Sequence, residues 1–215
     1  MDIMKQITVP GRKIEKSSFE IIDQEIGEHS FDKAQYEILR RIIHTTGDFE
    51  FKELTKFSPT AIEEAIKSIQ QGCNIIADVK MIEVGVNTKR LEHFNCKIKS
   101  FISDDDVIQL ALENETTRAI ESIRKAKRLG ILNNSIIAIG NTPTSLIETI
   151  KVCKEEGIAP ALIIGVPVGF VSAVESKDEL LNSDLNFILT KGRKGGSTIA
   201  VAIIHALLTL AQKEK

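Results

Sequence analysis

The sequence predicts an α/β fold of three layers, in which helices flank a mostly parallel central sheet and a helical segment comes first. Three short apolar runs, at residues 135–139, 161–166 and 186–189, have the length of strands, and a helical pattern follows each one. Repeated strand–loop–helix units of this kind are typical of a parallel sheet covered by helices. The first third of the chain instead carries apolar residues at helical spacing, which predicts the N-terminal helical segment.

The N-terminal segment contains three predicted helices. Ser17 and Glu20 match the Ser-x-x-Glu pattern of a capping box, so the first helix is expected to begin there, with Phe19 and the isoleucines after it on its apolar face. Apolar spacing predicts a second helix over residues 32–44. Ser58 and Pro59 suit the N-cap and first turn of a third helix.

The middle of the chain is harder to assign. Residues 74–86 are predicted to form a strand with a turn inside or after it, and residues 104–129 one long helix. Three aspartates suit the positive N-terminus of this helix, and Gly130 suits its C-cap. The helices after the three apolar strands are expected at residues 143–156, about 174–181 and 197–211.

Composition narrows the classes of protein that fit. The chain has 215 residues, 42% of them apolar, which predicts one domain spanning residues 1–215. A net charge of −2 argues against a nucleic-acid surface, and the chain shows neither a membrane-spanning run nor the core of a signal peptide, so a cytoplasmic location is expected. Three cysteines and four histidines lack the spacing of metal ligands, so no metal is expected.

Each of the three apolar strands ends in a loop of small residues, and the carboxyl ends of parallel strands share one edge of a sheet, where ligands bind. The loop at residues 190–197 adds Arg193 and Lys194 to its glycines, which suits carboxylate or phosphate groups. It is neither a P-loop nor a dinucleotide fingerprint, and a flexible turn with solvated charges fits the pattern equally well. The loop from Gly140 to Thr144 could simply start a helix, with Thr142 as its cap.

Two other residues are candidates for chemistry. His44 ends the second predicted helix, where a histidine is commonly just a partner for the helix dipole, but the residue type also suits general acid–base catalysis. Asp48 could orient it. Arg118 lies where the apolar stripe of the long helix weakens, which suggests a polar cleft, although a surface arginine is the simpler interpretation. His29, His93 and His205 have no distinguishing context and are given no role.

Together, these motifs make the sequence resemble the precorrin-8X methylmutase family, which includes the cobalt-precorrin-8 methylmutases. The order and spacing of the matching segments over the whole chain make the resemblance specific. Thr142 departs from the family's usual alanine, Ser172 from glycine, and His205 from a frequent asparagine. The matching segments are residues 14–22, 41–48, 78–81 with Gly85, Thr117-Arg118, 140–144, 165–171 with 175–177, and 192–197.

The resemblance implies an isomerase that moves a methyl group between adjacent ring-C carbons of precorrin-8 or cobalt-precorrin-8, giving hydrogenobyrinate or cobyrinate in cobalamin biosynthesis. It implies His44 as the proton donor, no cofactor, a tetrapyrrole substrate and a homodimer. The sequence does not indicate whether the substrate carries cobalt. The substrate-binding residues expected are Ser18, Thr45, Asp48, Met81, Arg118, Asn141, Thr142, Thr144, Gly165, Val168, Gly169, Arg193, Lys194, Gly195 and Gly196, with the backbone N–H groups of the glycine loops binding further carboxylates.

Two alternatives stay open. A non-catalytic carrier that passes a corrinoid to the next enzyme would bind the ring and leave the methyl group in place. A nucleotide-dependent enzyme of doubly wound type would bind a nucleotide and no corrinoid, although both nucleotide fingerprints are missing.

Overall fold

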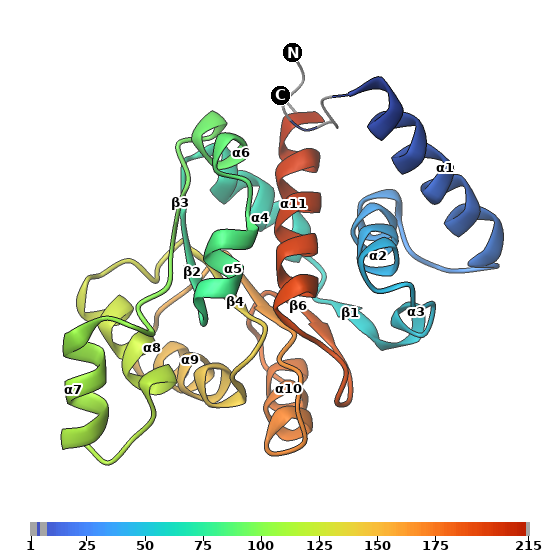
Figure 1. The fold of residues 1–215 in the computed structure, drawn as a ribbon. Coiled ribbons are helices and arrows are strands. Elements are labelled where there is room, and N and C mark those ends of the chain that lie inside the picture. The colour runs from blue at the N-terminus through green and yellow to red at the C-terminus, as the bar shows by residue number, and fades with distance from the viewer. Residues whose placement is uncertain (1–3, 5–7, 214–215) are drawn as a thin grey trace.

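The computed structural model describes residues 4 and 8–213, which form a six-stranded sheet in the order β1-β6-β5-β4-β2-β3 (Figure 1). The pairs β2–β3, β2–β4, β4–β5 and β5–β6 are parallel, and β1 runs antiparallel to β6 at one edge. The predicted α/β fold with a mostly parallel sheet is therefore confirmed. The strands are β1 Thr55–Phe57, β2 Asn74–Ala77, β3 Lys97–Lys99, β4 Ile136–Ile139, β5 Leu162–Gly165 and β6 Phe187–Thr190.

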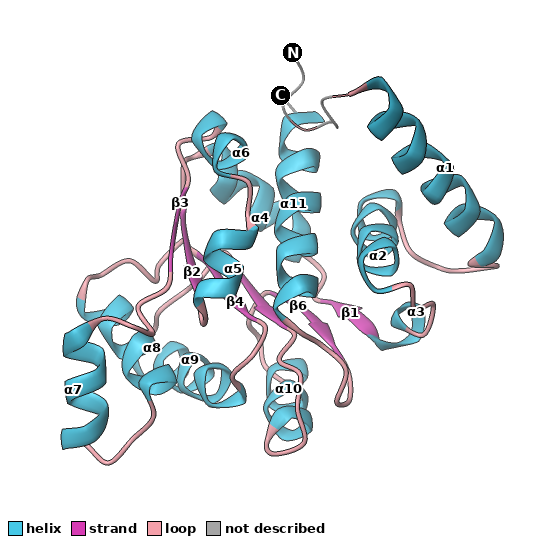
Figure 2. Cartoon of the chain, in the orientation of Figure 1, coloured by secondary structure: helices cyan, strands magenta, loops and turns pink. Residues whose placement is uncertain are grey.

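Helices cover both faces of the sheet (Figure 2). Alternate residues of β4 show the division, because Ile136 and Ala138 belong to one apolar cluster, whereas Ile137 and Ile139 belong to the other. The first cluster includes buried residues of α2, α4 and α11, and the second includes those of α8, α9 and α10. The helices are α1 Val9–Glu25, α2 Lys33–Thr46, α3 Phe51–Leu54, α4 Ala61–Gln70, α5 Lys80–Gly85, α6 Thr88–His93, α7 Asp105–Glu113, α8 Arg118–Arg128, α9 Pro143–Glu156, α10 Ala173–Leu181 and α11 Ser197–Lys213.

The three C-terminal strand–helix units agree with the sequence prediction, and α9 has the predicted bounds. Thr142 stands at the N-cap of α9, as expected, but its hydroxyl bonds to other side chains rather than to the helix backbone. The second helix begins at the N-cap Asp32, which forms a capping box with Gln35, and Gly47 ends it in the left-handed conformation (φ 64°).

Two predicted helix starts are wrong. The first helix begins eight residues before Ser17, with Thr8 at its N-cap accepting a hydrogen bond from the Gly11 N–H, so the Ser-x-x-Glu pattern lies inside α1. At α4 the N-cap position belongs to Thr60 rather than Ser58. The Ser58 hydroxyl instead accepts from the Phe187 N–H at 2.9 Å and so ties the start of α4 to β6.

The predicted long helix at residues 104–129 is also wrong, because the chain forms α7 and α8 with a break between them. Glu115, at φ 50°, makes the turn, which explains why the apolar stripe weakens there. Residues 74–86 hold the predicted strand as β2, but the short helix α5 follows it where only a turn was expected. The edge strands β1 and β3, three residues each, have no counterpart among the predicted strands.

The helix α11 is the central support of the fold. It runs beside α2 in the ribbon view and is packed against α2, α4 and α5, with eleven of its residues buried (Figure 1). Within the described part of the chain, no helix is both long and apolar enough to cross a membrane.

Candidate functional site

The strand order places a crevice between the carboxyl ends of β2 and β4. From β2 the chain goes on to β3 on one side, and from β4 it goes on to β5 on the other, so neighbouring connections run in opposite directions. Open α/β sheets bind ligands at such a switch point. Asp78 follows β2 directly, and Gly140 follows β4 directly, so these two residues flank the crevice.

A carboxylate of the protein itself occupies this crevice. Asp78 is 1% exposed and accepts hydrogen bonds from the N–H groups of Gly140 (3.2 Å), Asn141 (2.8 Å) and Thr142 (2.8 Å). The Thr142 hydroxyl lies 3.0 Å from the same carboxylate. Burial raises the pKa of Asp78, and these four donors oppose that shift. The three N–H groups therefore serve Asp78, and the expectation that this loop offers them to a substrate is wrong.

The glycine loops also pack against one another. A Cβ on Gly140 would lie 2.7 Å from the Cα of Ser197, and one on Gly195 would lie 2.2 Å from the Val166 carbonyl oxygen. The Gly196 N–H donates to that same carbonyl at 2.8 Å, and the Gly169 N–H donates to the Arg193 carbonyl at 3.2 Å. The glycines at these positions therefore permit close contact between loops, and part of the backbone that the sequence suggested for ligand binding joins the loops instead.

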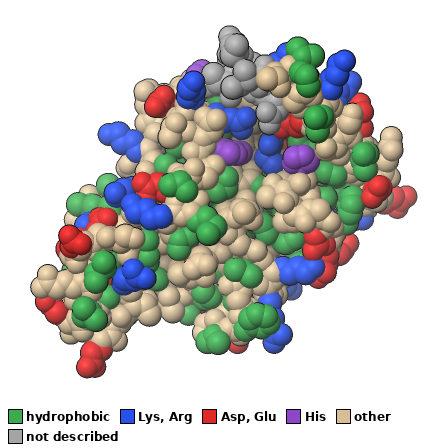
Figure 3. Space-filling view, viewed as in Figure 1, with side chains coloured by type: hydrophobic (Ala, Val, Ile, Leu, Met, Phe, Trp, Pro, Cys, Tyr) green, Lys and Arg blue, Asp and Glu red, His purple; other side chains and the backbone are tan. Residues whose placement is uncertain are grey.

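An open cavity of about 390 Å³ lies along α11, between α2 and α5. In the space-filling view of this face, two histidine side chains lie close together with basic side chains beside them (Figure 3). Of the predicted site residues, Thr45 and Met81 line the cavity, and Met81 and Val84 are strongly exposed apolar side chains there. The sequence interpretation missed the other lining residues, which are Arg41, Val84, Gly85, Ser197, Thr198, Val201, Ala202 and His205.

His205, to which the sequence gave no role, lines this cavity. Its Nε2 accepts a hydrogen bond from the Asn87 N–H at 3.0 Å, which joins α11 to the start of α6. Burial, together with the nearby charges of Arg90 and Arg41, lowers the pKa of His205 to about 4. The ring is therefore neutral near pH 7 and carries its proton on Nδ1. Its spacing of four residues from Val201 on an apolar helix is the one signal that could have placed it on the cavity face.

His44 is exposed in the last turn of α2. Its ring lies 5.2 Å from the Phe19 ring of α1, measured between centroids. The suggestion that Asp48 orients His44 is wrong, because the Asp48 carboxylate bonds to the Glu50 N–H and to the Lys194 ammonium. That ammonium holds the pKa of Asp48 below its usual range.

The two predicted cations of the β6–α11 loop differ in their contacts. Lys194 forms ion pairs with Asp48 at 2.6 Å and with Glu50 at 2.7 Å, so it joins this loop to the segment that follows His44. The Arg193 guanidinium lies 5.3 Å above the ring of Phe170, which is 81% exposed, and it forms no ion pair with the described residues. Arg193 is therefore free to meet an anion, whereas Lys194 already has two carboxylates.

The remaining predicted residues are spread around the sheet edge. Arg118 is the exposed first residue of α8, and its neighbour Thr117 lies 3.5 Å from the Thr144 hydroxyl of α9. Gly165 lies within β5, where a Cβ would be 2.5 Å from Leu180. Val168 is 44% exposed in the loop after β5, and the Ser18 hydroxyl donates to the Ile14 carbonyl within α1.

Two other features of the described residues bear on where the site lies. A larger cavity of about 440 Å³ lies beside the α1–α2 connection, but it is lined by residues of that connection, the start of α2, α3 and β1, and none of the predicted site residues is among them. Among the described residues, no three or more histidine, cysteine, aspartate or glutamate side chains lie together in a group that could hold a metal ion. The cavity along α11 is therefore the candidate site.

Comparison with known proteins gives the same family as the motifs. The family model described as precorrin-8X methylmutase matches residues 13–210. The cobalt-precorrin-8 methylmutase of Leptospira interrogans is 55% identical over 98% of both chains, and that of Priestia megaterium is 47% identical over 96% of this chain and 91% of its own. The crystal structure of the precorrin-8X methylmutase of Thermus thermophilus, 40% identical, superposes with a TM-score of 0.88 and covers 94% of this chain and 99% of its own. The chain therefore belongs to the precorrin-8X methylmutase family and is by class an isomerase of cobalamin biosynthesis.

Proposed function

We propose that the chain converts cobalt-precorrin-8 to cobyrinate by moving one methyl group between adjacent carbons of ring C. The observation that carries this proposal is the 55% identity, over 98% of both chains, to a protein named cobalt-precorrin-8 methylmutase. The relative at 47% identity carries the same name, which favours the cobalt-containing substrate over the metal-free one. The reaction is an isomerisation, so no atom enters or leaves.

The cavity along α11 suits part of such a substrate. A corrin precursor is an apolar macrocycle with carboxylates at its rim, and Met81, Val84 and Val201 offer an apolar wall. Arg41 stands at the same cavity, and Arg193 and Arg118 are exposed around the sheet edge. Guanidinium groups bind carboxylates in bidentate fashion. The proposed substrate contacts are Ser18, Thr45, Asp48, Met81, Arg118, Asn141, Thr142, Thr144, Gly165, Val168, Gly169, Arg193, Lys194, Gly195 and Gly196, with Lys194 and Asp48 acting as a pair.

His44 is the proposed proton donor. Of the two histidines near the cavity, His205 has a pKa of about 4 and holds no second proton near neutrality, so it can offer a hydrogen bond but not act as an acid. His44 is exposed, and its ring rests against Phe19 at the end of α2. A proton placed on a ring nitrogen of the substrate would weaken the bond to the migrating methyl group, and a rigid hold on the macrocycle would favour the migration.

The chain is further proposed to work as a single domain over residues 1–215, as a homodimer, in the cytoplasm and without a cofactor. A cavity of about 390 Å³ that is open to solvent leaves much of a tetrapyrrole uncovered, which favours a second subunit over the exposed side chains of Phe170 and Val171. Sedimentation analysis of the purified chain tests the oligomeric state.

An absorbance time course tests the reaction. Purified protein is mixed with cobalt-precorrin-8 and, separately, with precorrin-8. Conversion to the rearranged corrin at a rate proportional to enzyme, and faster with the cobalt form, is the expected result. A bound chromophore that keeps its original spectrum would instead establish the carrier, and binding of a nucleotide without corrinoid binding would favour the nucleotide-dependent enzyme.

A further inference from the structure

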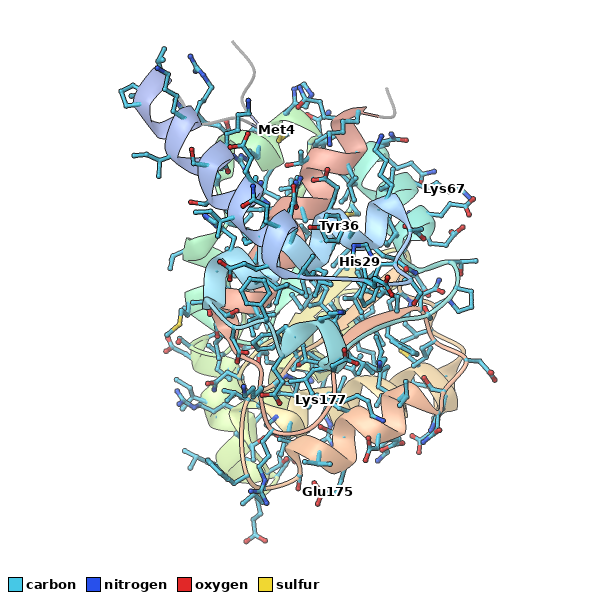
Figure 4. All side chains as sticks on the ribbon, turned by 90° about the vertical axis from the view of Figure 1, so that its right-hand side faces the viewer. Met4, His29, Tyr36, Lys67, Glu175 and Lys177 are labelled. Carbon is cyan, nitrogen blue, oxygen red and sulfur yellow. The ribbon has the colours of Figure 1, made fainter. Side chains whose placement is uncertain are left out.

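Lys177 is a buried cation that forms no ion pair with the described residues, although the adjacent Asp178 acts on it electrostatically. Its side chain is 0% exposed on α10, and no carboxylate of the described residues forms an ion pair with it. Figure 4 shows Lys177 within the body of the molecule, whereas Glu175, two residues earlier on the same helix, is at its lower edge. Burying an unpaired charge is costly, so its presence calls for an explanation.

The ammonium lies beneath the loop between β6 and α11. It donates a hydrogen bond to the Lys194 carbonyl at 3.1 Å, and the Thr190 hydroxyl donates to the same carbonyl at 2.9 Å. Because Thr190 already satisfies this carbonyl, a second neutral donor would add little. A lysine adds what threonine lacks, which is a positive charge.

The other charges around the loop show why the positive charge of Lys177 would help the loop to attract an anion. The Lys194 ammonium is neutralised by Asp48 and Glu50, so it contributes little net attraction for an anion. Arg193 carries the loop's one exposed guanidinium without an ion pair in the described chain. Lys191 is exposed and likewise has no ion pair among the described residues. Lys177 adds a further cation without an ion pair, and its burial shields it from the water and salt that screen surface charges such as those of Arg193 and Lys191.

We propose that Lys177 is a positioning residue whose buried positive charge strengthens the binding of a substrate carboxylate at the Arg193–Gly196 loop. This inference rests on the proposed function, since it takes the carboxylate-rimmed corrin as the ligand. Burial lowers the pKa of Lys177 to about 8, which still leaves the group mainly protonated at neutral pH. Lys177 acts through its hydrogen bond to the loop and through the electrostatic field at the loop, and it does not touch the reacting carbons.

The variant K177M removes the charge and keeps the length of the side chain, and K177Q removes the charge but keeps a hydrogen-bond donor. The matched control, T190V, removes the other donor to the same carbonyl and leaves the charge. Replacing a buried ion by an apolar side chain of similar volume is often neutral for stability, so K177M is expected to fold, and K177Q covers the case in which it does not.

The full chain and its variants are assayed at pH 7 for kcat and KM with cobalt-precorrin-8 and for the Kd of cobyrinic acid by absorbance titration. Both Lys177 variants should raise KM and Kd at least fivefold and change kcat less than twofold, whereas T190V should change all three less than twofold. A KM within twofold of wild type in either folded Lys177 variant would overturn the inference, as would an equal rise in T190V. If the wild-type chain neither converts nor binds the corrin, the proposed function is overturned, and with it the assumption that a corrin carboxylate is the ligand of this loop.

Discussion

Asp78→Asn is the substitution that tests the structure of the switch-point crevice most directly. The amide keeps one acceptor oxygen. In its better orientation that oxygen faces the N–H groups of Asn141 and Thr142 and the Thr142 hydroxyl. Its NH₂ group then faces the Gly140 N–H, which donates to Asp78 at 3.2 Å in the wild type, so two donors meet.

The cost follows from these contacts. One buried N–H without an acceptor costs about 1–3 kcal/mol, and three hydrogen bonds lose the extra strength of an ionised acceptor. Removing a buried charge offsets part of this, which leaves a net loss of about 2 kcal/mol in the free energy of unfolding. For a chain of 215 residues that loss lowers Tm by about 4–8 °C.

Urea unfolding followed by circular dichroism, together with a thermal scan, measures the loss. Asp184→Asn is the matched control, because the Asp184 side chain is exposed and makes no hydrogen bond or ion pair with the described residues. The control should match wild type within about 0.5 kcal/mol. If Asp78→Asn unfolds at the same urea concentration as wild type, the carboxylate is not what holds the Gly140–Thr142 loop and the reasoning is wrong.

Three further outcomes are expected. His44→Ala should lower kcat at least about 100-fold with Tm unchanged, because the side chain is exposed; retained turnover in the absorbance assay would reject it as the acid. Because the pKa of His205 is lowered to about 4 in the native state, the unfolded chain takes up a proton at this residue at a higher pH than the native chain does. The free energy of unfolding should therefore fall as the pH falls from about 6.5 to 4. In a plot of the urea midpoint against pH, His205→Gln should flatten this decline. Ser172 adopts the left-handed backbone conformation (φ 59°), which is unfavourable for a residue other than glycine, so Ser172→Gly should stabilise the protein by about 0.5–1 kcal/mol in urea unfolding. Ser17→Gly inside α1 should destabilise it by about as much. A change of the same sign in both variants would contradict the backbone argument.

The sequence was sufficient where structure is local and repeated. The βα units at β4, β5 and β6 each join a fully buried strand to a helix whose buried residues recur at helical spacing, and both patterns are visible in a single chain. The Asp32 cap and the Gly47 end of α2 are likewise set by neighbouring residues. The start of α1 was missed because Ser17 and Glu20 fit a capping box by chance, while the actual signal is Thr8 followed by a proline in the first turn.

Other features depend on contacts between segments far apart in the chain, which a sequence pattern does not contain. The strand β1 is three residues long, too short to show an alternation, and it exists because it pairs with β6 more than 130 residues later. Likewise, Asp78 belongs to a matching family segment, but only the fold brings it under the Gly140 loop. The histidine at position 205 looked featureless because its cavity is made by three helices that are separated in sequence.

The same reasoning explains why counting basic residues in a motif does not identify those that bind an anion. Adjacent in the sequence, Arg193 and Lys194 look equivalent, yet the structure gives Lys194 two carboxylates and leaves Arg193 over an exposed ring. Lys177 looks like a surface residue of a helix, yet it is the buried cation under the loop. Because an ion-paired charge attracts a substrate weakly and an unpaired buried charge attracts it strongly, the residues that govern binding of the corrin carboxylates are expected to be Arg193 and Lys177, while Lys194 holds the loop to the segment that follows His44.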